Sequence, residues 1–477
     1  MLDIFKKQYV LSSCEIDLPN MNKYSLGKAI LYTHNLLKTQ RFVTDNGKQI
    51  IVVGNAYCMD CAPKSIESDI TEWDGKSLVE LTRNWTGRWI LFTDSDIVTD
   101  ACGLMSAFYK NEDNRWIVSS SLAVMGQLMN VNLREECSSG GLNWYLLPNT
   151  KIGGISKLCS TQRIVFSEDE LEVKSFIWQE DFTALSTEEK SRELGKMLVN
   201  ACKNISREEK DVLLALTGGK DSRLVFSALL HSGIDFSTYT FDYLKIRSSD
   251  KSVPKKMARA NNIQHSFIKR GKYQPDKNEN YKIFTFGNTN GLDKVFYAYD
   301  QFDKIPKEAV IIRSGFFEAG QRYGRTVAGN TLESFENGIK SYYFEAFKDE
   351  KQREAFELWL GWIKDNPIPF IDVRDRFYIE QRVGGWAAAI EQSLDLNDFT
   401  SIQIANCPRL LSLLLSASED ERMNAEISMK CIQQLKPELL KYPVNKTTFV
   451  DMVFFFFDVM RNPIKRLRNF TNRHRRK

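Results

Sequence analysis

The segment Thr217-Gly218-Gly219-Lys220-Asp221-Ser222 carries residue types that can hold a phosphate group. Two adjacent glycines let backbone N–H groups approach an anion closely, and the hydroxyls of Thr217 and Ser222 add hydrogen-bond donors. The carboxylate of Asp221 would repel a bare phosphate, so we expect a Mg²⁺ ion between the two. The segment therefore predicts a loop that binds a pyrophosphate group together with a metal ion.

The residues on either side predict a strand before this loop and a helix after it. Val212 to Leu216 form a continuous apolar run, as in a parallel strand buried on both faces. From Leu224 to Leu229 apolar residues recur at helical spacing, and Gly233 is a typical helix stop. The loop would then lie at a helix start, where unpaired N–H groups attract anions. An ordinary glycine-rich turn is the alternative interpretation.

Two well-known phosphate-binding loops do not fit the segment. In a Walker A loop, Leu214 would have to be Gly and Asp221 would have to be Ser or Thr. The G-x-G-x-x-G pattern of dinucleotide-binding domains is also missing. The segment resembles instead the S-G-G-x-D-S loop of the PP-loop ATP pyrophosphatases, which cleave ATP between the α- and β-phosphates. This resemblance implies that ATP and Mg²⁺ bind at Thr217, Gly218, Gly219, Lys220, Asp221 and Ser222.

Length and composition limit the classes of protein that remain. A chain of 477 residues suggests two or three domains. It has no run of 18 apolar residues that would span a membrane, and its start is not typical of a signal peptide. Nine cysteines without a disulfide spacing indicate a reduced, cytoplasmic protein. The four scattered histidines argue against a His-based catalytic triad or metal site, and one C-x-x-C from Cys58 to Cys61 is weak evidence for zinc.

The positive charge is concentrated at the end of the sequence. From Arg461 onward there are eight basic residues and no acid, and subtracting them from the net charge of +4 leaves about −4 for the rest. An acidic body argues against a nucleic-acid-binding protein, including a tRNA-modifying PP-loop enzyme. The apolar stretch around Phe454 to Phe457 favours a last core helix with a solvated tail over a contact with a membrane surface. The sequence leaves open whether the chain forms a homodimer.

The first 165 residues predict antiparallel sheets. Short apolar strands are expected at 50–54, 89–93, 97–100, 107–109 and 116–119, with turns between them. Asn84 to Asp94, Asp100 to Gly103 and Ala107 to Tyr109 resemble the G-[RK]-[FW]-a-l-x-x-x-D … D-x-x-G … l-Y-Y pattern of class II glutamine amidotransferase domains. The resemblance implies an Ntn-hydrolase-like antiparallel β-sandwich of the α+β type at the N-terminus.

This part departs from that family at the nucleophile. The family uses a cysteine at position 2, freed by removal of the first Met, whose own α-amino group is the base. Leu2 stands at this position, and Cys14 lies inside the chain. We therefore expect a degenerate domain without glutaminase activity.

After the loop, strands and helices alternate. Strands are expected at 237–241, 264–268 and 309–313, with a helix at 252–261 between the first two. This alternation predicts a doubly wound parallel sheet, in which ligands bind outside the carboxyl ends of the strands. From about residue 331 the chain is predicted to be helical, with long segments at 351–364 and 372–396. The fold class is thus α/β, with a helical C-terminal part.

Asparagine synthetases, a branch of the PP-loop group, resemble this chain in domain order and in several short stretches. The resemblance implies adenine binding near Phe241 and a phosphate-side turn with Gly315 and the metal ligand Glu318. Asp250 matches the family's s-D-x-x-x-A region, although Pro254 stands where Ala is usual. Two further residues would act on the substrate, Arg382 by contact and Lys446 by neutralising the acyl-adenylate transition state. A plain surface role is the alternative for Glu318, Arg382 and Lys446. The Glu expected on the amine side is missing, with Gln403 nearest to its place.

Together these features predict four parts: an amidotransferase-like domain (1–165), a linker with a helix (166–205), an asparagine-synthetase-like PP-loop domain (206–450), and an apolar helix with a basic tail (451–477). The expected activity is amide formation through an acyl-AMP, with a carboxylate substrate and ammonia or an amine as donor. The alternatives are a non-catalytic ATP-binding scaffold and a specialised enzyme acting on a natural-product peptide or a surface-polysaccharide sugar.

Overall fold

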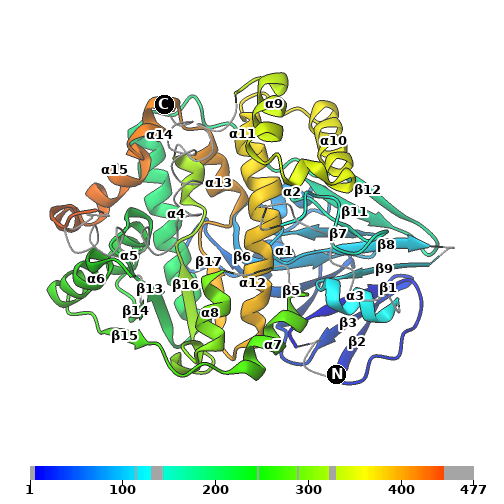
Figure 1. Ribbon diagram of the computed structural model, residues 1–477, viewed down its shortest axis with the longest axis horizontal. Helices are drawn as coiled ribbons and strands as arrows, with labels where there is room; N and C mark the ends of the chain where they lie inside the picture. The colour runs from blue at the N-terminus through cyan, green and yellow to red at the C-terminus, as the bar shows by residue number, and fades with distance from the viewer. Residues whose placement is uncertain are drawn as a thin grey trace.

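The computed structural model describes residues 6–112, 115–129, 142, 144–243, 246–286, 289, 291–321 and 329–444. It contains two antiparallel sheets followed by a parallel sheet and helices, which confirms the expected α/β class with antiparallel sheets first (Figure 1). In Figure 1 the helical column labelled α12 stands between the parallel sheet on the left and the antiparallel sheets on the right.

Two six-stranded antiparallel sheets form the N-terminal part. The first has the order β10 (Ser156–Lys157), β8 (Phe108–Glu112), β9 (Arg115–Ser119), β1 (Tyr9–Ser12), β3 (Ala29–His34) and β2 (Met21–Leu26). The second has the order β12 (Leu171–Ser175), β11 (Gln162–Phe166), β7 (Asp96–Thr99), β6 (Trp85–Phe92), β5 (Gln49–Cys58) and β4 (Thr39–Val43). Buried side chains from both sheets, including Leu11 and Ile90, share one core. The second sheet continues to Ser175, past the domain boundary expected near residue 165.

A five-stranded parallel sheet forms the second part. Its order is β15 (His265–Lys269), β14 (Ser237–Asp242), β13 (Val212–Ala215), β16 (Val310–Arg313) and β17 (Thr400–Gln403), and every neighbouring pair is parallel. From β13 the chain moves outward to β14 and β15 and then returns to β16 on the other side. The strand order therefore reverses at β13, which makes its carboxyl end the switch point where ligands bind in such sheets.

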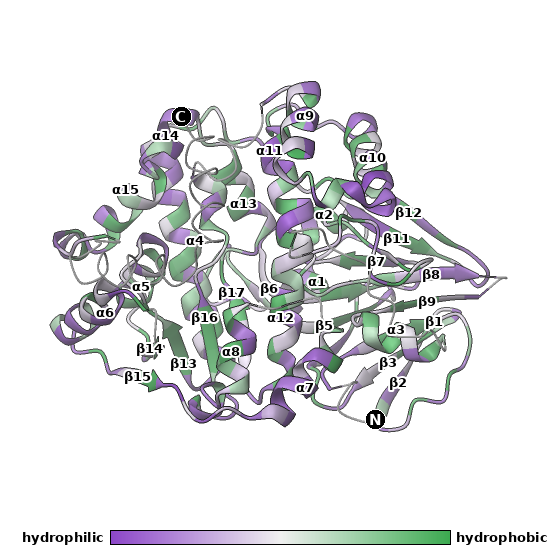
Figure 2. Ribbon diagram, viewed as in Figure 1, coloured by the Kyte–Doolittle hydropathy of each residue, from purple (hydrophilic) through white to green (hydrophobic). Residues whose placement is uncertain are grey.

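Helices cover both faces of the parallel sheet. On one face, Leu214 and Ile312 share a core with α4 (Thr187–Glu208), α5 (Lys220–Ser232) and α15 (Glu426–Leu435). On the other, Leu213 and Ile311 pack with residues of α8 (Leu292–Ala298) and with Phe302. Figure 2 shows hydrophobic colour on the central strands and hydrophilic colour on outer helices such as α10 and α15. The continuous apolar run at β13 is explained because the strand is covered on both faces.

The remaining helices are short or belong to the helical C-terminal part. They are α1 (Ile66–Thr71), α2 (Leu78–Thr82), α3 (Leu122–Leu128), α6 (Ser248–Ala260), α7 (Pro275–Phe284), α9 (Leu332–Tyr342), α10 (Glu350–Asp365), α11 (Val373–Arg376), α12 (Ala388–Ser393), α13 (Pro408–Leu415) and α14 (Glu419–Met423). The long helix expected at 372–396 is helical but not uniformly α. Between α11 and α12 it contains a π-helical segment, η5 (Phe377–Ala387), and it ends in one 3₁₀ turn, η6 (Leu394–Leu396).

Buried polar contacts join the two parts of the molecule. The guanidinium of Arg88 in β6 donates to both carboxylate oxygens of Asp395, at 2.7 and 2.9 Å. Asn406, which follows β17, donates to Asp100 and to the Gly87 carbonyl. Because the side chains of Arg88 and Asp395 are about 10% exposed or less, this ion pair fixes the relative position of the antiparallel and parallel sheets. In the part of the chain that the structure describes, no helix is long and apolar enough to cross a membrane.

Candidate active site

The loop predicted to bind phosphate lies at the switch point of the parallel sheet. It connects β13 to α5, and Gly219 is the residue that precedes the helix. No side chain caps this helix start, so its first N–H groups are left for a ligand. A Cβ atom on Gly218 would lie 3.1 Å from a carboxylate oxygen of Asp250 and 3.2 Å from the Ser249 carbonyl oxygen. Gly218 is therefore needed for the close approach of α6 to the loop.

The loop is ordered by its own hydroxyls and by one carboxylate. The Thr217 N–H donates to Ser222 Oγ at 3.1 Å, and the Gly219 N–H donates to Thr217 Oγ1 at 3.2 Å. The Gly218 N–H donates to Asp250 Oδ1 at 2.7 Å. An anionic oxygen thus already sits on a loop amide, which shows that this backbone geometry suits a negatively charged group. A phosphate at the same N–H would have to replace the Asp250 carboxylate.

Two carboxylates from neighbouring strand ends act on each other beside the loop. Asp221 lies in the first turn of α5, and Glu318 lies in the 3₁₀ turn η3 (Phe317–Gly320) after β16. Burial, followed by the negative charge of Glu318, raises the pKa of Asp221 to about 6, against the opposing effects of Gln321 and Lys220. Such a repulsion between like charges is relieved by a cation.

Hydrogen bonds hold both carboxylates in place. Gln321 Nε2 donates to Asp221 Oδ1 at 2.8 Å, and the Tyr378 hydroxyl donates to Glu318 Oε2 at 3.2 Å. Within the described ranges, no group of three or more Asp, Glu, His or Cys side chains is placed to hold a metal by itself. Two carboxylates fit Mg²⁺, which commonly takes one or two protein carboxylates and completes its shell with substrate phosphates and water.

Gly315, on the turn after β16, is tied to the neighbouring strand. Its N–H donates to Gln403 Oε1 at 3.0 Å, and a Cβ there would come within 2.7 Å of that oxygen. Gln403 Nε2 in turn donates to Glu391 Oε1 at 2.8 Å, and Glu391 also accepts from Arg313 and Ser401, each at 2.9 Å. Gln403, the residue nearest to the place of the missing Glu, is thus an uncharged side chain that connects Gly315 to the buried Glu391. The Glu391 carboxylate already accepts hydrogen bonds from three side chains.

The Phe241 side chain is used for packing. Its ring stacks on Phe296 with centroids 4.3 Å apart and meets the edges of Tyr239 and Phe302. A contact with adenine at this strand end would therefore use backbone groups of β14, as the resemblance implies. This role stays a prediction.

Arg382 contacts aromatic rings. Its guanidinium is 4.9 Å from the ring centroid of Trp386 and 5.8 Å from that of Trp144, which belongs to the N-terminal part. Tyr378, on the same helical segment, instead reaches Glu318. Substrate contact by Arg382 stays a prediction.

Lys446 lies outside the described residues, as do Leu2 and the basic tail. The segment that leads to Lys446 is held at the loop by Arg223, a fully buried side chain. Its guanidinium donates to the carbonyl oxygens of Tyr442 at 2.7 Å, Pro443 at 3.0 Å and Gly218 at 3.3 Å. Sequence reasoning missed Arg223, although an arginine directly after the loop, on a helix with a buried stripe, was a visible signal.

Comparisons with known proteins add little beyond these observations. No protein-family model matches the chain, and no curated protein matches it. Among solved structures, the NMN synthetase of Francisella tularensis has 16% identity over 39% of this chain and 97% of its own, with a TM-score of 0.21. The glutamine PRPP amidotransferase of B. subtilis, in complex with ADP and GMP, has 8% identity over 70% of this chain and 74% of its own, with a TM-score of 0.23.

A third structure, the glutamine-dependent NAD⁺ synthetase of Acinetobacter baumannii in complex with ADP, has 12% identity over 61% of each chain and a TM-score of 0.21. At such low identities and TM-scores, these similarities carry no argument about the function of this chain. The assignment of function rests on the residues at the switch point.

Proposed function

We propose that this chain is an ATP-dependent carbon–nitrogen ligase of the asparagine synthetase type. A carboxylate oxygen of the substrate attacks the α-phosphate of ATP, so that an acyl-adenylate forms and pyrophosphate leaves. Ammonia or an amine then attacks the acyl carbon, and an amide forms while AMP leaves. The observation that carries this proposal is the carboxylate pair of Asp221 and Glu318 beside the glycine loop at the switch point.

The loop and the start of α5 would bind the phosphates. The N–H groups of Gly218 and Gly219 would turn from Asp250 and Thr217 to phosphate oxygens, and the uncapped first turn of α5 would add further donors. Asp221 and Glu318 would hold Mg²⁺, because a divalent cation offsets the cost of two negative charges in a partly buried site. When bound, Mg²⁺ would neutralise the negative charge that develops on the leaving pyrophosphate.

The acceptor side of the proposal rests on fewer contacts. Glu391 is held by Arg313, Ser401 and Gln403, so this carboxylate is a fixed support and not a base for the incoming amine. In the proposal, Lys446 neutralises charge on the acyl-adenylate and Arg382 contacts the substrate. The carboxylate substrate stays defined only by its class.

Ammonia or an amine is the proposed nitrogen donor, and three buried cysteines of the structure are unsuited to glutamine hydrolysis. Burial raises the pKa of Cys58, Cys202 and Cys407 to about 12 in each case. Thiols with such pKa values are protonated near neutral pH and are poor nucleophiles for glutamine hydrolysis.

The proposal is tested by trapping the acyl-adenylate with hydroxylamine. The full chain is incubated with MgATP, hydroxylamine and a panel of amino-acid, peptide and sugar carboxylates, and both pyrophosphate and hydroxamate are measured. We expect carboxylate-dependent formation of both products, and a loss of about a hundredfold or more in Asp221→Ala and Glu318→Gln. ATP binding without carboxylate-dependent pyrophosphate from any member of the panel would favour the non-catalytic scaffold instead.

A further inference from the structure

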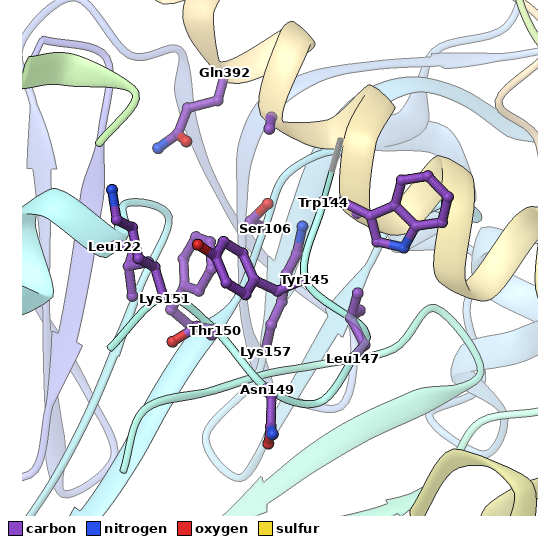
Figure 3. Close-up of a pocket in the computed structure, with 13 residues that line it drawn as sticks. Ser106, Leu122, Trp144, Tyr145, Leu147, Asn149, Thr150, Lys151, Lys157 and Gln392 are labelled. Atoms are coloured by element: carbon purple, nitrogen blue, oxygen red, sulfur yellow. The ribbon is translucent and has the colours of Figure 1, made fainter. Parts of the chain in front are cut away.

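A hollow lies where the antiparallel sheets meet the segment from η5 to α12 (Figure 3). Its empty space, counting the open mouth, is about 450 Å³. The walls come from the N-terminal part, for example Ser106 and Phe108, and from Gly385, Ala389 and Gln392 of the helical segment. None of the lining residues belongs to the glycine loop or to η3, so this pocket is separate from the candidate active site.

The pocket contains a buried lysine with spare hydrogen-bond donors. Lys157, in the short strand β10, is 6% exposed, and its Nζ donates to the Gly384 carbonyl oxygen of η5. The same Nζ lies 5.4 Å from the ring centroid of Phe108. Among the described residues, no carboxylate lies within 4.0 Å of this ammonium. An ammonium has three N–H donors, so two remain for a bound group.

The charged groups near Lys157 are either neutralised by other partners or act on it only weakly. The charged groups that act on it are Asp100, Arg88 and the Cys159 thiol. The Asp100 carboxylate is already held by the N–H groups of Leu104 and Met105 and by Asn406. Burial lowers the pKa of Lys157 to about 7. An anion beside Nζ would therefore supply the partner that the protein itself does not provide.

The rest of the lining selects the kind of anion. The walls include the apolar side chains of Phe108, Leu122, Trp144 and Leu147, and none of the described residues that line the pocket is acidic. A second lysine, Lys151, lines it as well, and Figure 3 shows Lys151 and Lys157 on different sides of Tyr145. A charged contact at one point and the apolar, partly aromatic part of the wall suit a ligand with one anionic group and a flat hydrocarbon body.

We propose that this pocket binds a small carboxylic acid with a flat apolar body. The carboxylate accepts hydrogen bonds from Lys157 Nζ, and the body lies against Phe108, Trp144 and Leu147. The bound acid would also touch Gly385 of η5, the segment whose Tyr378 holds Glu318. This site is independent of the proposed ligase activity, because it requires neither ATP nor the glycine loop.

The test uses the full chain and phenylacetate as the probe, with phenylacetamide as the uncharged match and phenethylamine as the cation. Binding is measured by titration calorimetry at pH 8 in two buffers that differ in ionisation enthalpy. We expect phenylacetate to bind about tenfold more tightly than phenylacetamide, with uptake of protons, and phenethylamine not to bind. Proton uptake is the readout that a merely structural lysine would not produce.

Two variants and one control complete the experiment. Lys157→Met should weaken phenylacetate binding by about tenfold or more and remove the proton uptake. Ala389→Phe should block the pocket while leaving Lys157 in place, so it carries the test if Lys157→Met does not fold. Lys76→Met, at a side chain that is 83% exposed, should bind like the wild type. Equal binding of phenylacetate and phenylacetamide, unchanged binding in Ala389→Phe, or no binding of phenylacetate would overturn the proposal.

Discussion

Replacing Asp221 by Asn should stabilise the ligand-free protein while abolishing ATP cleavage. The wild-type carboxylate is half-buried beside Glu318, and its pKa is raised from 3.8 to about 6. In the wild type, Asp221 Oδ1 accepts from Gln321 Nε2 at 2.8 Å; the amide oxygen of an Asn side chain can accept the same hydrogen bond but carries no charge. The variant therefore removes the repulsion and the desolvation cost with little change of shape.

The size of the effect follows from the pKa shift. Each pKa unit corresponds to about 1.4 kcal/mol, so ionised Asp221 costs the folded state on the order of 3 kcal/mol. Because the pKa is raised, this cost is absent below about pH 3.8, grows as the pH rises, and is constant above about pH 7. The stability gain of Asp221→Asn should thus be largest at pH 8 and about half as large at pH 5.

Urea unfolding monitored by circular dichroism at pH 5 and pH 8 measures this difference. Asp235→Asn, at an exposed carboxylate on the loop after α5, is the matched control and should leave stability unchanged. Adding MgATP should stabilise the wild type and not Asp221→Asn, because the variant lacks one carboxylate for the cation. If Asp221→Asn is no more stable than the wild type at pH 8, or if its gain is the same at both pH values, the argument from the carboxylate pair is wrong.

Three further variants test the surroundings of the site. Tyr378→Phe removes one hydrogen bond to Glu318 and should lower pyrophosphate formation about three- to tenfold, far less than Glu318→Gln; equal losses in steady-state assays would show that the hydroxyl does more than position the carboxylate. Arg223→Met leaves buried carbonyl oxygens without donors and should lower the free energy of unfolding by about 2–4 kcal/mol in urea unfolding, with faster proteolysis near residue 443. Unchanged proteolysis would show that Arg223 does not hold this segment at the loop. Arg88→Met leaves the buried Asp395 without its ion-pair partner and should lower the free energy of unfolding by about 3–5 kcal/mol. The double variant Arg88→Met with Asp395→Leu should recover much of this loss; no recovery would mean that the broken ion pair does not cause the loss of stability.

The sequence was sufficient for the elements that depend on local patterns. The apolar run at 212–216, the glycine pair and the helical stripe after it predict β13, the loop and α5 correctly, because each is encoded by neighbouring residues. The start of α4 is also encoded locally, because Ser186 and Glu189 form a capping box there. The order of antiparallel and parallel parts follows from strand spacing in the same way.

Contacts between distant residues could not be predicted in this way. Nothing local indicates that Asp250 accepts from the Gly218 N–H, that Gln403 connects Gly315 to Glu391, or that Lys157 meets η5. The π-helical segment was missed because its apolar residues also satisfy an α-helical stripe over two turns, and the difference in residues per turn becomes visible only in the hydrogen bonds.

The bond that is cleaved in ATP tests the central claim most directly. ATP labelled in the α-phosphate is incubated with Mg²⁺, hydroxylamine and the carboxylate panel, and the labelled nucleotides are separated by ion exchange. Cleavage between the α- and β-phosphates predicts label in AMP, in an amount equal to the pyrophosphate released, and no label in AMP with Asp221→Asn. Label in ADP, or the same amount of labelled AMP in wild type and Asp221→Asn, would contradict the assignment of the loop and its carboxylate pair as an adenylating centre.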